Sequence, residues 1–153
     1  MANACSARVL RRLLVAATVP LLVTAVGCAK EKEERELRAA SQKSCDGLLK
    51  PANTAAALPS DLPAGASGAT FYETEKQGAT TLYYAYVAGD DLVRTRDAIK
   101  SAFESAGYEI EGTDQENGAE AEFEWKGKAK EGSVQVIHLC KNNLRLRWRV
   151  GRE

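Results

Sequence analysis

Histidine is scarce in this 153-residue chain, which contains only His138. A catalytic triad, or a zinc site with several imidazoles, cannot be built around one histidine. The chain also lacks a G-x-S-x-G elbow and a glycine-rich phosphate loop. Its acidic stretch 114–118 lacks the glycine and glutamate spacing of an EF-hand. We therefore expect no enzyme, no metal and no cofactor, and interpret His138 as a structural residue of a strand.

Long apolar runs are absent as well. The longest, residues 13–26, has 14 residues and is interrupted by Thr18, Pro20 and Thr24. A membrane-spanning helix needs about 20 apolar residues. Three arginines precede the run, and no acidic residue occurs among the first 30. This pattern predicts a secretory signal peptide, and two of the arginines are adjacent, which leaves a twin-arginine export route open.

The leader ends in the sequence TAVGC, residues 24–28. Ala25 and Gly27 would suit an ordinary signal-peptide cleavage site. Residues 26–28 also resemble the lipobox of bacterial lipoproteins, with Ala25 where leucine is commonest in that family. The resemblance covers about the first 28 residues. It implies cleavage before Cys28 and diacylation of its sulfur, and two acyl chains are enough for stable membrane anchoring.

The cysteine count fits this resemblance. Cleavage removes Cys5 and leaves Cys28, Cys45 and Cys140. Three thiols outside the cytosol leave one unpaired, and lipidation of Cys28 resolves the count. We therefore predict a disulfide between Cys45 and Cys140; the alternative is two separately buried thiols.

The mature chain, residues 28–153, has the size of one domain. It retains 18 basic and 21 acidic residues, a net charge of −3, which argues against nucleic-acid binding. After the signal peptide 1–27, residues 28–50 are expected to form the lipidated cysteine, a charged tether and a helix ended by Pro51. The charged part is either a hydrophilic spacer or a partner-binding helix. Residues 51–68 are a linker or an arm across the surface, and residues 69–153 form the folded domain.

The domain pattern predicts the order ββαββββ. We expect strands at 69–76, 80–87, 108–111, 119–125, 134–140 and 144–150, with a polar loop at 112–118. The helix begins after Asp90 or Asp91 and ends at Gly107. One helix on one face of a mostly antiparallel sheet is an α+β fold. The sides that carry Trp125 and Trp148 are expected to meet the helix.

Two groups of residues are candidate binding surfaces. Tyr83, Tyr84 and Tyr86 form an aromatic hairpin strand whose rings either pack across strands or present a surface to a partner. A second alternating strand carries three outward arginines, and another carries three outward glutamates. The residues are Arg145, Arg147 and Arg149, and Glu120, Glu122 and Glu124.

The charged strands allow two interpretations. They are either a solvated face with weak ion pairs or, for the arginines, a contact for anionic lipid headgroups or an acidic envelope polymer. The glutamates look like an exposed strand face rather than a catalytic carboxyl pair.

The function expected from the sequence is a non-enzymatic, lipid-anchored binding or interaction module of the cell envelope. Its membrane contact is the acyl anchor, and its partner is an envelope protein or ligand that the sequence does not name. Ala29 stands where a retention signal would place aspartate, so a two-membrane bacterium would sort the protein to its outer membrane. The alternatives are an assembly lipoprotein acting through its charged helix, or a secreted domain without lipid.

Overall fold

The computed structural model describes residues 26–116, 118–127 and 129–152. The predicted leader up to residue 25 lies outside the described residues. The described chain folds as an α+β unit with a six-stranded antiparallel sheet, two α-helices and a short 3-10 helix. The elements are α1 Val26–Ala40, η1 Thr54–Ala56, β1 Thr70–Gln77, β2 Thr80–Ala88, α2 Leu92–Ser105, β3 Glu109–Glu116, β4 Glu120–Lys126, β5 Lys130–Cys140 and β6 Asn143–Arg152.

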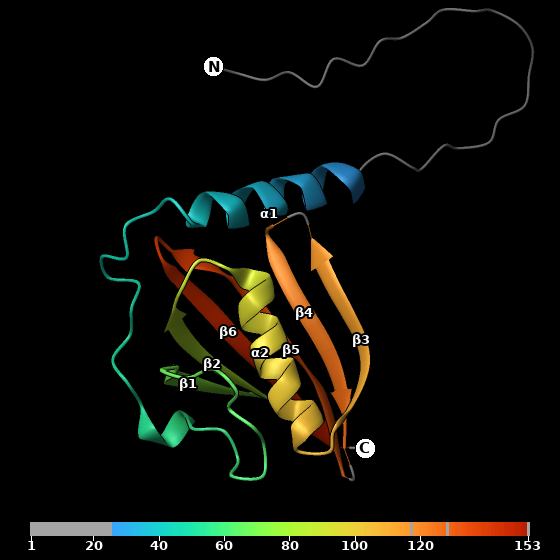
Figure 1. The fold of residues 1–153 in the computed structure, drawn as a ribbon. Coiled ribbons are helices and arrows are strands. Elements are labelled where there is room, and N and C mark those ends of the chain that lie inside the picture. Colours follow the sequence, from blue (N-terminus) through green and yellow to red (C-terminus); the bar gives the residue numbers. More distant parts are fainter. Residues whose placement is uncertain (1–25, 117, 128, 153) are drawn as a thin grey trace, which may run out of the picture.

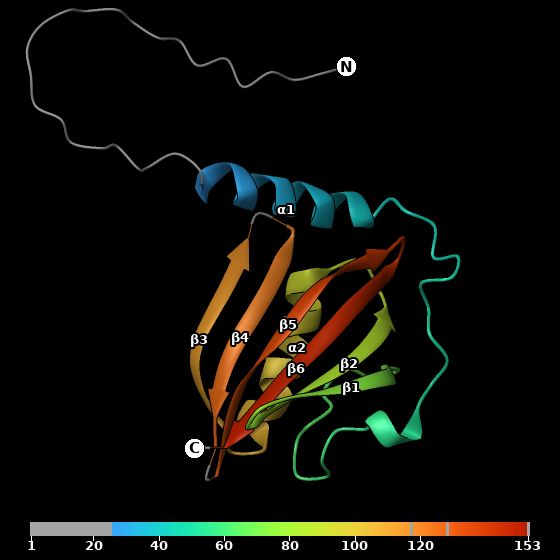
Figure 2. The same ribbon diagram turned by 180° about the vertical axis from the view of Figure 1, so that it is seen from behind.

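The strand order across the sheet is β1-β2-β6-β5-β4-β3, with every neighbouring pair antiparallel. Helix α2 connects β2 to β3 and lies on one face of the sheet (Figure 1). Seen from behind, the other face carries no described helix (Figure 2). The α+β class and the order ββαββββ are confirmed.

The core fills the space between α2 and the sheet. Helix positions Leu92, Ile99 and Phe103 are buried, as their three- and four-residue spacing predicts. The ring of Phe103 lies 5.1 Å from that of Trp125. Trp148 is fully buried in the same core. The inward direction predicted for both tryptophans is confirmed.

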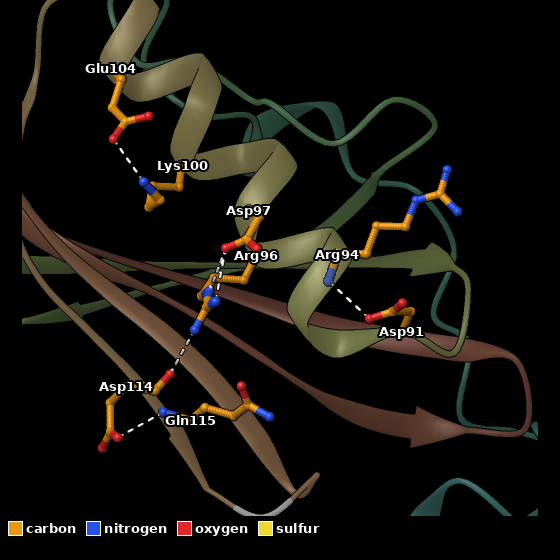
Figure 3. Close-up of polar contacts among 8 residues, drawn as sticks. All are labelled: Asp91, Arg94, Arg96, Asp97, Lys100, Glu104, Asp114 and Gln115. Atoms are coloured by element: carbon orange, nitrogen blue, oxygen red, sulfur yellow. Dashed lines mark hydrogen bonds and ion pairs between the residues drawn. The ribbon is translucent and has the colours of Figure 1, made fainter.

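Helix α2 has the ends that its sequence predicts. The Asp91 side chain accepts a hydrogen bond from the backbone N–H of Arg94 at 2.9 Å, and Gly107 has a φ of 85° just after the helix. Figure 3 shows this cap, and also Arg96, whose Nη1 donates to the backbone carbonyl of Asp114 at 3.1 Å. Arg96 therefore ties α2 to β3, the strand at the edge of the sheet.

The predicted polar loop at 112–118 is wrong. Residues Glu109–Glu116 form one strand, with a register shift between Ile110 and Gly112. β3 is an edge strand with mostly exposed side chains, so its sequence is polar on both sides and lacks the apolar alternation that marks a strand. Its hydrogen bonds come from β4, which the local sequence does not reveal.

The N-terminal helix also ends earlier than predicted. α1 stops at Ala40, eleven residues before Pro51, and the chain turns through Gly47, which has a φ of 71°. The predicted disulfide between Cys45 and Cys140 is present, with Cα atoms 5.2 Å apart. Beside it, the backbone N–H of Lys141 donates to the carbonyl of Lys43 at 2.8 Å. These bonds attach the segment after α1 to the β5–β6 hairpin.

Helix α1 itself lies across one end of the sheet in both views (Figures 1 and 2). The Glu34 side chain is only 15% exposed and accepts a hydrogen bond from Arg38. Leu37, one turn further on, is half-buried. This part of the charged segment therefore rests on the domain rather than extending freely from it.

The segment between residues 51 and 68 packs closely on the domain. Leu62 and Ala56 are buried, and the backbone N–H of Asn53 donates to the carbonyl of Phe71. Gly65 has a φ of 64°, and a Cβ there would lie 2.8 Å from the Cα of Ile99. The segment is the arm across the surface that was one of the two expectations for it, lying over α2 and the β1 edge, and η1 is a short helical turn within it.

Removing the disulfide should lower stability sharply. It closes a loop with a sequence separation of 95 residues, for which the chain-entropy model gives about 4–5 kcal/mol. For a domain of this size that corresponds to a fall in Tm of about 15–20 °C. The double variant Cys45→Ser/Cys140→Ser should show this fall in thermal unfolding. Reductant should lower the wild type to the same Tm and leave the variant unchanged; an unchanged wild-type Tm would contradict a stabilising bond.

Gly132 should be irreplaceable for a packing reason. A Cβ at this position would lie 1.8 Å from the carbonyl oxygen of Arg149 and 3.0 Å from the Trp125 ring. Overpacking of this kind costs about 1–3 kcal/mol or more. Gly112→Ala is the matched control, because its Cβ would meet only the Glu124 carboxylate, at 3.7 Å. In denaturant titration Gly132→Ala should lose stability and Gly112→Ala should lose far less; equal losses would refute the steric argument.

Candidate functional site

The open face, meaning the face of the sheet opposite α2, is the candidate functional site. Side chains alternate between the two faces of a strand, so residues between the buried core positions all project here. On β6 the core positions include Leu146 and Trp148, and on β4 they include Phe123 and Trp125. The predicted outward arginines and glutamates therefore do lie on one face.

Strand register aligns these side chains into three rows that cross the sheet, here called rungs. Each rung has an arginine on β6, a neutral residue on β5 and a glutamate on β4. The rungs are Arg149–Ser133–Glu124, Arg147–Gln135–Glu122 and Arg145–Ile137–Glu120. The open face thus has an arginine stripe, a neutral stripe and a glutamate stripe.

The rungs continue onto the flanking strands. On β2, Leu82, Tyr84 and Tyr86 extend the rungs of Arg149, Arg147 and Arg145 in that order. On β3, Gly112, Asp114 and Glu116 extend the rungs of Glu124, Glu122 and Glu120. Across these five strands, the face passes from apolar and aromatic side chains through positive and neutral ones to negative ones. On the sixth strand, β1, Glu73 and Glu75 pair with Tyr84 and Leu82, and Glu75 accepts a hydrogen bond from the Tyr84 hydroxyl at 3.2 Å.

The arginine stripe forms no ion pair with the described residues of its own chain. Among the residues that the structure describes, the side chains of Arg145, Arg147 and Arg149 form no hydrogen bond or ion pair. The Nε atom of Arg145 is buried without an acceptor. The glutamate stripe is two strand spacings away, about 10 Å. The weak ion-pair network considered for this face is therefore not formed in this part of the chain.

The glutamate stripe is partly desolvated. Burial raises the pKa of Glu120 above its ordinary value, because it disfavours the charged carboxylate. The Gln135 side chain donates a hydrogen bond that lowers this pKa, while the carboxyls of Glu122 and Glu116 raise it further. The part of the open face on β3 and β4 is therefore rich in acidic residues that are close to one another.

The aromatic hairpin is divided between the two faces. Tyr84 and Tyr86 lie on the open face, where their rings stack on Tyr72 at centroid distances of 6.3 and 6.1 Å. Lys50 lies over the Tyr72 ring at 5.2 Å. Tyr83 faces the other way and packs against the core. Cross-strand packing and partial exposure thus occur together, and Tyr83 does not share a surface with the other two.

His138 lies at the end of the sheet near the start of α2. It is half-buried, and burial lowers the pKa of its imidazole, while nearby Asp90 opposes this effect. In the described part of the chain no cluster of three or more potential metal ligands occurs. A depression on the open face has a volume of about 230 Å³ and is lined in part by Ser133, Arg149 and Glu124. It belongs to the rung of those residues and lacks a nucleophile paired with a base.

The in-register alignment of the stripes was not foreseen from the sequence. The R-x-R-x-R and E-x-E-x-E patterns predict two charged strand faces, and the strand expected at 134–140 could lie between them, but the patterns do not predict that the charges align in register. Two buried apolar residues of the open face, Leu82 at 6% and Ile137 at 5% exposure, were also missed. The alternation of residues 80–87 could have indicated Leu82.

Comparisons with known proteins add no assignment. No model of a protein family matches the sequence, and no curated protein was found to be similar to it. Within the described residues, no helix has both the length and the apolar character needed to cross a bilayer.

Glu120 should make stability depend on pH. Its folded-state pKa is raised, so its contribution is most favourable below the unfolded-state pKa, about 4.3, and is lost as pH rises through the folded-state value. Glu120→Gln should therefore raise the Tm at pH 7, and this gain should disappear near pH 3.5. Glu124→Gln, on an exposed side chain of the same stripe, is the control. If Glu120→Gln raises the Tm equally at both pH values, desolvation of the Glu120 carboxylate is not the cause.

Proposed function

We propose that this chain is a lipid-anchored binding module of the cell envelope that acts through its open face. The observation that carries the proposal is the open face itself. Its arginines form no ion pair with the residues that the structure describes, and they lie beside half-buried tyrosine rings. Arginine and tyrosine are enriched among the residues that dominate binding energy at protein interfaces. Both are held here on the strands of a sheet whose opposite face is covered by α2 and the arm of residues 51–68.

The disulfide supports an extracytoplasmic location. Disulfides persist in oxidising compartments and are rare in the cytosol. Cys45–Cys140 joins the N-terminal segment to the sheet in the described structure. The leader predicted from residues 1–27 would deliver the chain to such a compartment.

The anchor is proposed from the lipobox-like sequence at residues 24–28. The Cys28 backbone lies in α1, while its side chain lies outside the described part. Cleavage before Cys28 would make the lipidated residue the first of the helix. Because α1 rests on the end of the sheet, the domain would then sit close to the membrane, with that end toward the bilayer.

A binding role fits this geometry better than catalysis. The open face offers charge, rings and hydrogen-bond donors over a broad surface, whereas catalysis needs a nucleophile or a base held beside a reacting group. An assembly role through α1 has less support, since α1 already lies against the domain near β5.

The anchor can be tested by metabolic labelling with a clickable palmitate in a bacterial host. The full chain should become labelled and fractionate with membranes, because lipoprotein processing acylates Cys28. Cys28→Ser should lose the label and either leave the membrane or accumulate as precursor. Cys5→Ser is the matched control, since that cysteine lies in the leader, and it should label normally. An unlabelled wild type would remove the lipid anchor from the proposal.

A further inference from the structure

We propose that the open face binds the open face of a second copy of this chain, so that the protein forms a two-fold dimer. This inference names the partner of the surface described above and so rests on the proposed function. The charge arrangement alone restricts how two such faces can meet.

The face is electrically antisymmetric about β5. Each of the three rungs carries a positive residue one strand to one side of β5 and a negative residue one strand to the other side. A two-fold axis that lies in the interface and runs along β5 exchanges the two sides while preserving position along the strands. Each arginine then faces the glutamate of the same rung in the partner, giving six opposite-charge pairs from three rungs.

The alternative axis is excluded by the same pattern. An in-plane two-fold axis perpendicular to the strands keeps each stripe on its own side. It would place arginines on arginines and glutamates on glutamates, and like charges facing each other across an interface are strongly unfavourable. Complementarity therefore selects the axis parallel to the strands.

The arginines are the residues that this arrangement would satisfy. They form no ion pair with the described residues of their own chain and would gain acceptors from the partner, which fully buried charges require. Leu82, nearly buried in its own chain, would lie opposite the partner's Gly112. Tyr84 would lie opposite the partner's Asp114 and keep the hydrogen bond that its hydroxyl donates to Glu75 of its own chain. Aligned packing of two sheets, with strand directions within about 30° of each other, is a common geometry.

The membrane makes a weak dimer sufficient. Five strands at about 4.8 Å spacing and three rungs at about 6.6 Å spacing cover roughly 480 Å² of each copy, or about 1,000 Å² together. That is near the lower limit of about 1,000 Å² for a specific interface. An axis parallel to the strands leaves both α1 helices at the same end, so both proposed anchors reach one bilayer. Confinement there raises the effective concentration of the partner.

Cysteine cross-linking can locate the axis. Gln135 is the middle residue of the neutral stripe, so Gln135→Cys would place two thiols opposite each other across the axis. The full chain, in whichever cell fraction contains it, is treated with a short bismaleimide, and dimers are read on a gel. Gln135→Cys should cross-link, and more so at low salt, where screening is weak. Arg94→Cys, an exposed site on α2 at the opposite face, should not; equal cross-linking of both variants would overturn the proposal.

Charge exchange then tests the pairing. An acidic variant reverses the arginine stripe, and a basic variant reverses the glutamate stripe, each in the Gln135→Cys background. Each variant alone should lose the cross-linked dimer, because both stripes of every chain then carry the same sign of charge and would repel the partner. Co-expressed, the two variants should cross-link to each other, and a chain with both stripes exchanged should regain its homodimer. The substitutions are Arg145→Glu, Arg147→Glu and Arg149→Glu, and Glu120→Arg, Glu122→Arg and Glu124→Arg.

The outcomes separate this inference from the proposed function. If cross-linking returns when the acidic and basic variants are co-expressed, both variants must be folded. The homodimer of the chain with both stripes exchanged is a second check of the pairing. If neither reversal changes cross-linking, or if mixing fails to restore it, the dimer is wrong. A different result would point to an anionic surface as the partner of the open face. In that case Gln135→Cys gives no dimer, the acidic variant loses binding to vesicles of anionic lipid, and the basic variant binds them more tightly. The dimer would then be refuted, while binding through the open face would be supported. If the wild-type chain carries no palmitate label but still forms the dimer, the dimer is supported and the lipid anchor is refuted.

Discussion

The structure depends on the packing of a single helix against a six-stranded sheet. One helix can bury only one face of that sheet, and the two-residue period of the strands assigns every second side chain to the other face. The apolar half of each strand therefore goes to α2, where Phe103 meets Trp125. The same period collects the charges of β4 and β6 on the open face. The core and the candidate site are thus two results of one alternation.

Antiparallel strand pairing determines how the charged side chains of neighbouring strands line up, which alternation within one strand does not. β5 and β6 are joined by a tight hairpin in which Asn142 has a φ of 58° and Cys140 pairs with Asn143. This turn sets the register of Arg145, Arg147 and Arg149 against β5, and the β4–β5 pairing sets Glu120, Glu122 and Glu124. A one-residue slip in either pairing would send a whole stripe into the core. The burial of Trp125 and Trp148 therefore fixes the charge pattern as well as the core.

The N-terminal segment is held by covalent and packing contacts together. The disulfide at Cys45 holds it at the β5–β6 hairpin, and the arm from residue 51 to 68 covers α2 and the β1 edge. Arg96 bonds to the opposite edge strand. Exposed sheet edges invite pairing with other chains; the arm lies along the β1 edge, while β3 keeps mostly exposed side chains.

The sequence by itself determined the elements whose signals are local. Asp91 and Gly107 predicted the ends of α2 because capping depends on neighbouring residues, and strict alternation predicted the inward sides of β4 and β6. Cysteine parity, given the lipobox-like leader, predicted the pairing of Cys45 with Cys140. Tertiary structure decided what local signals cannot carry: that polar residues 112–116 form an edge strand, and that α1 ends at Ala40. It also placed β5 between the two charged strands, because strand order and register come from hydrogen bonds between residues far apart in the chain.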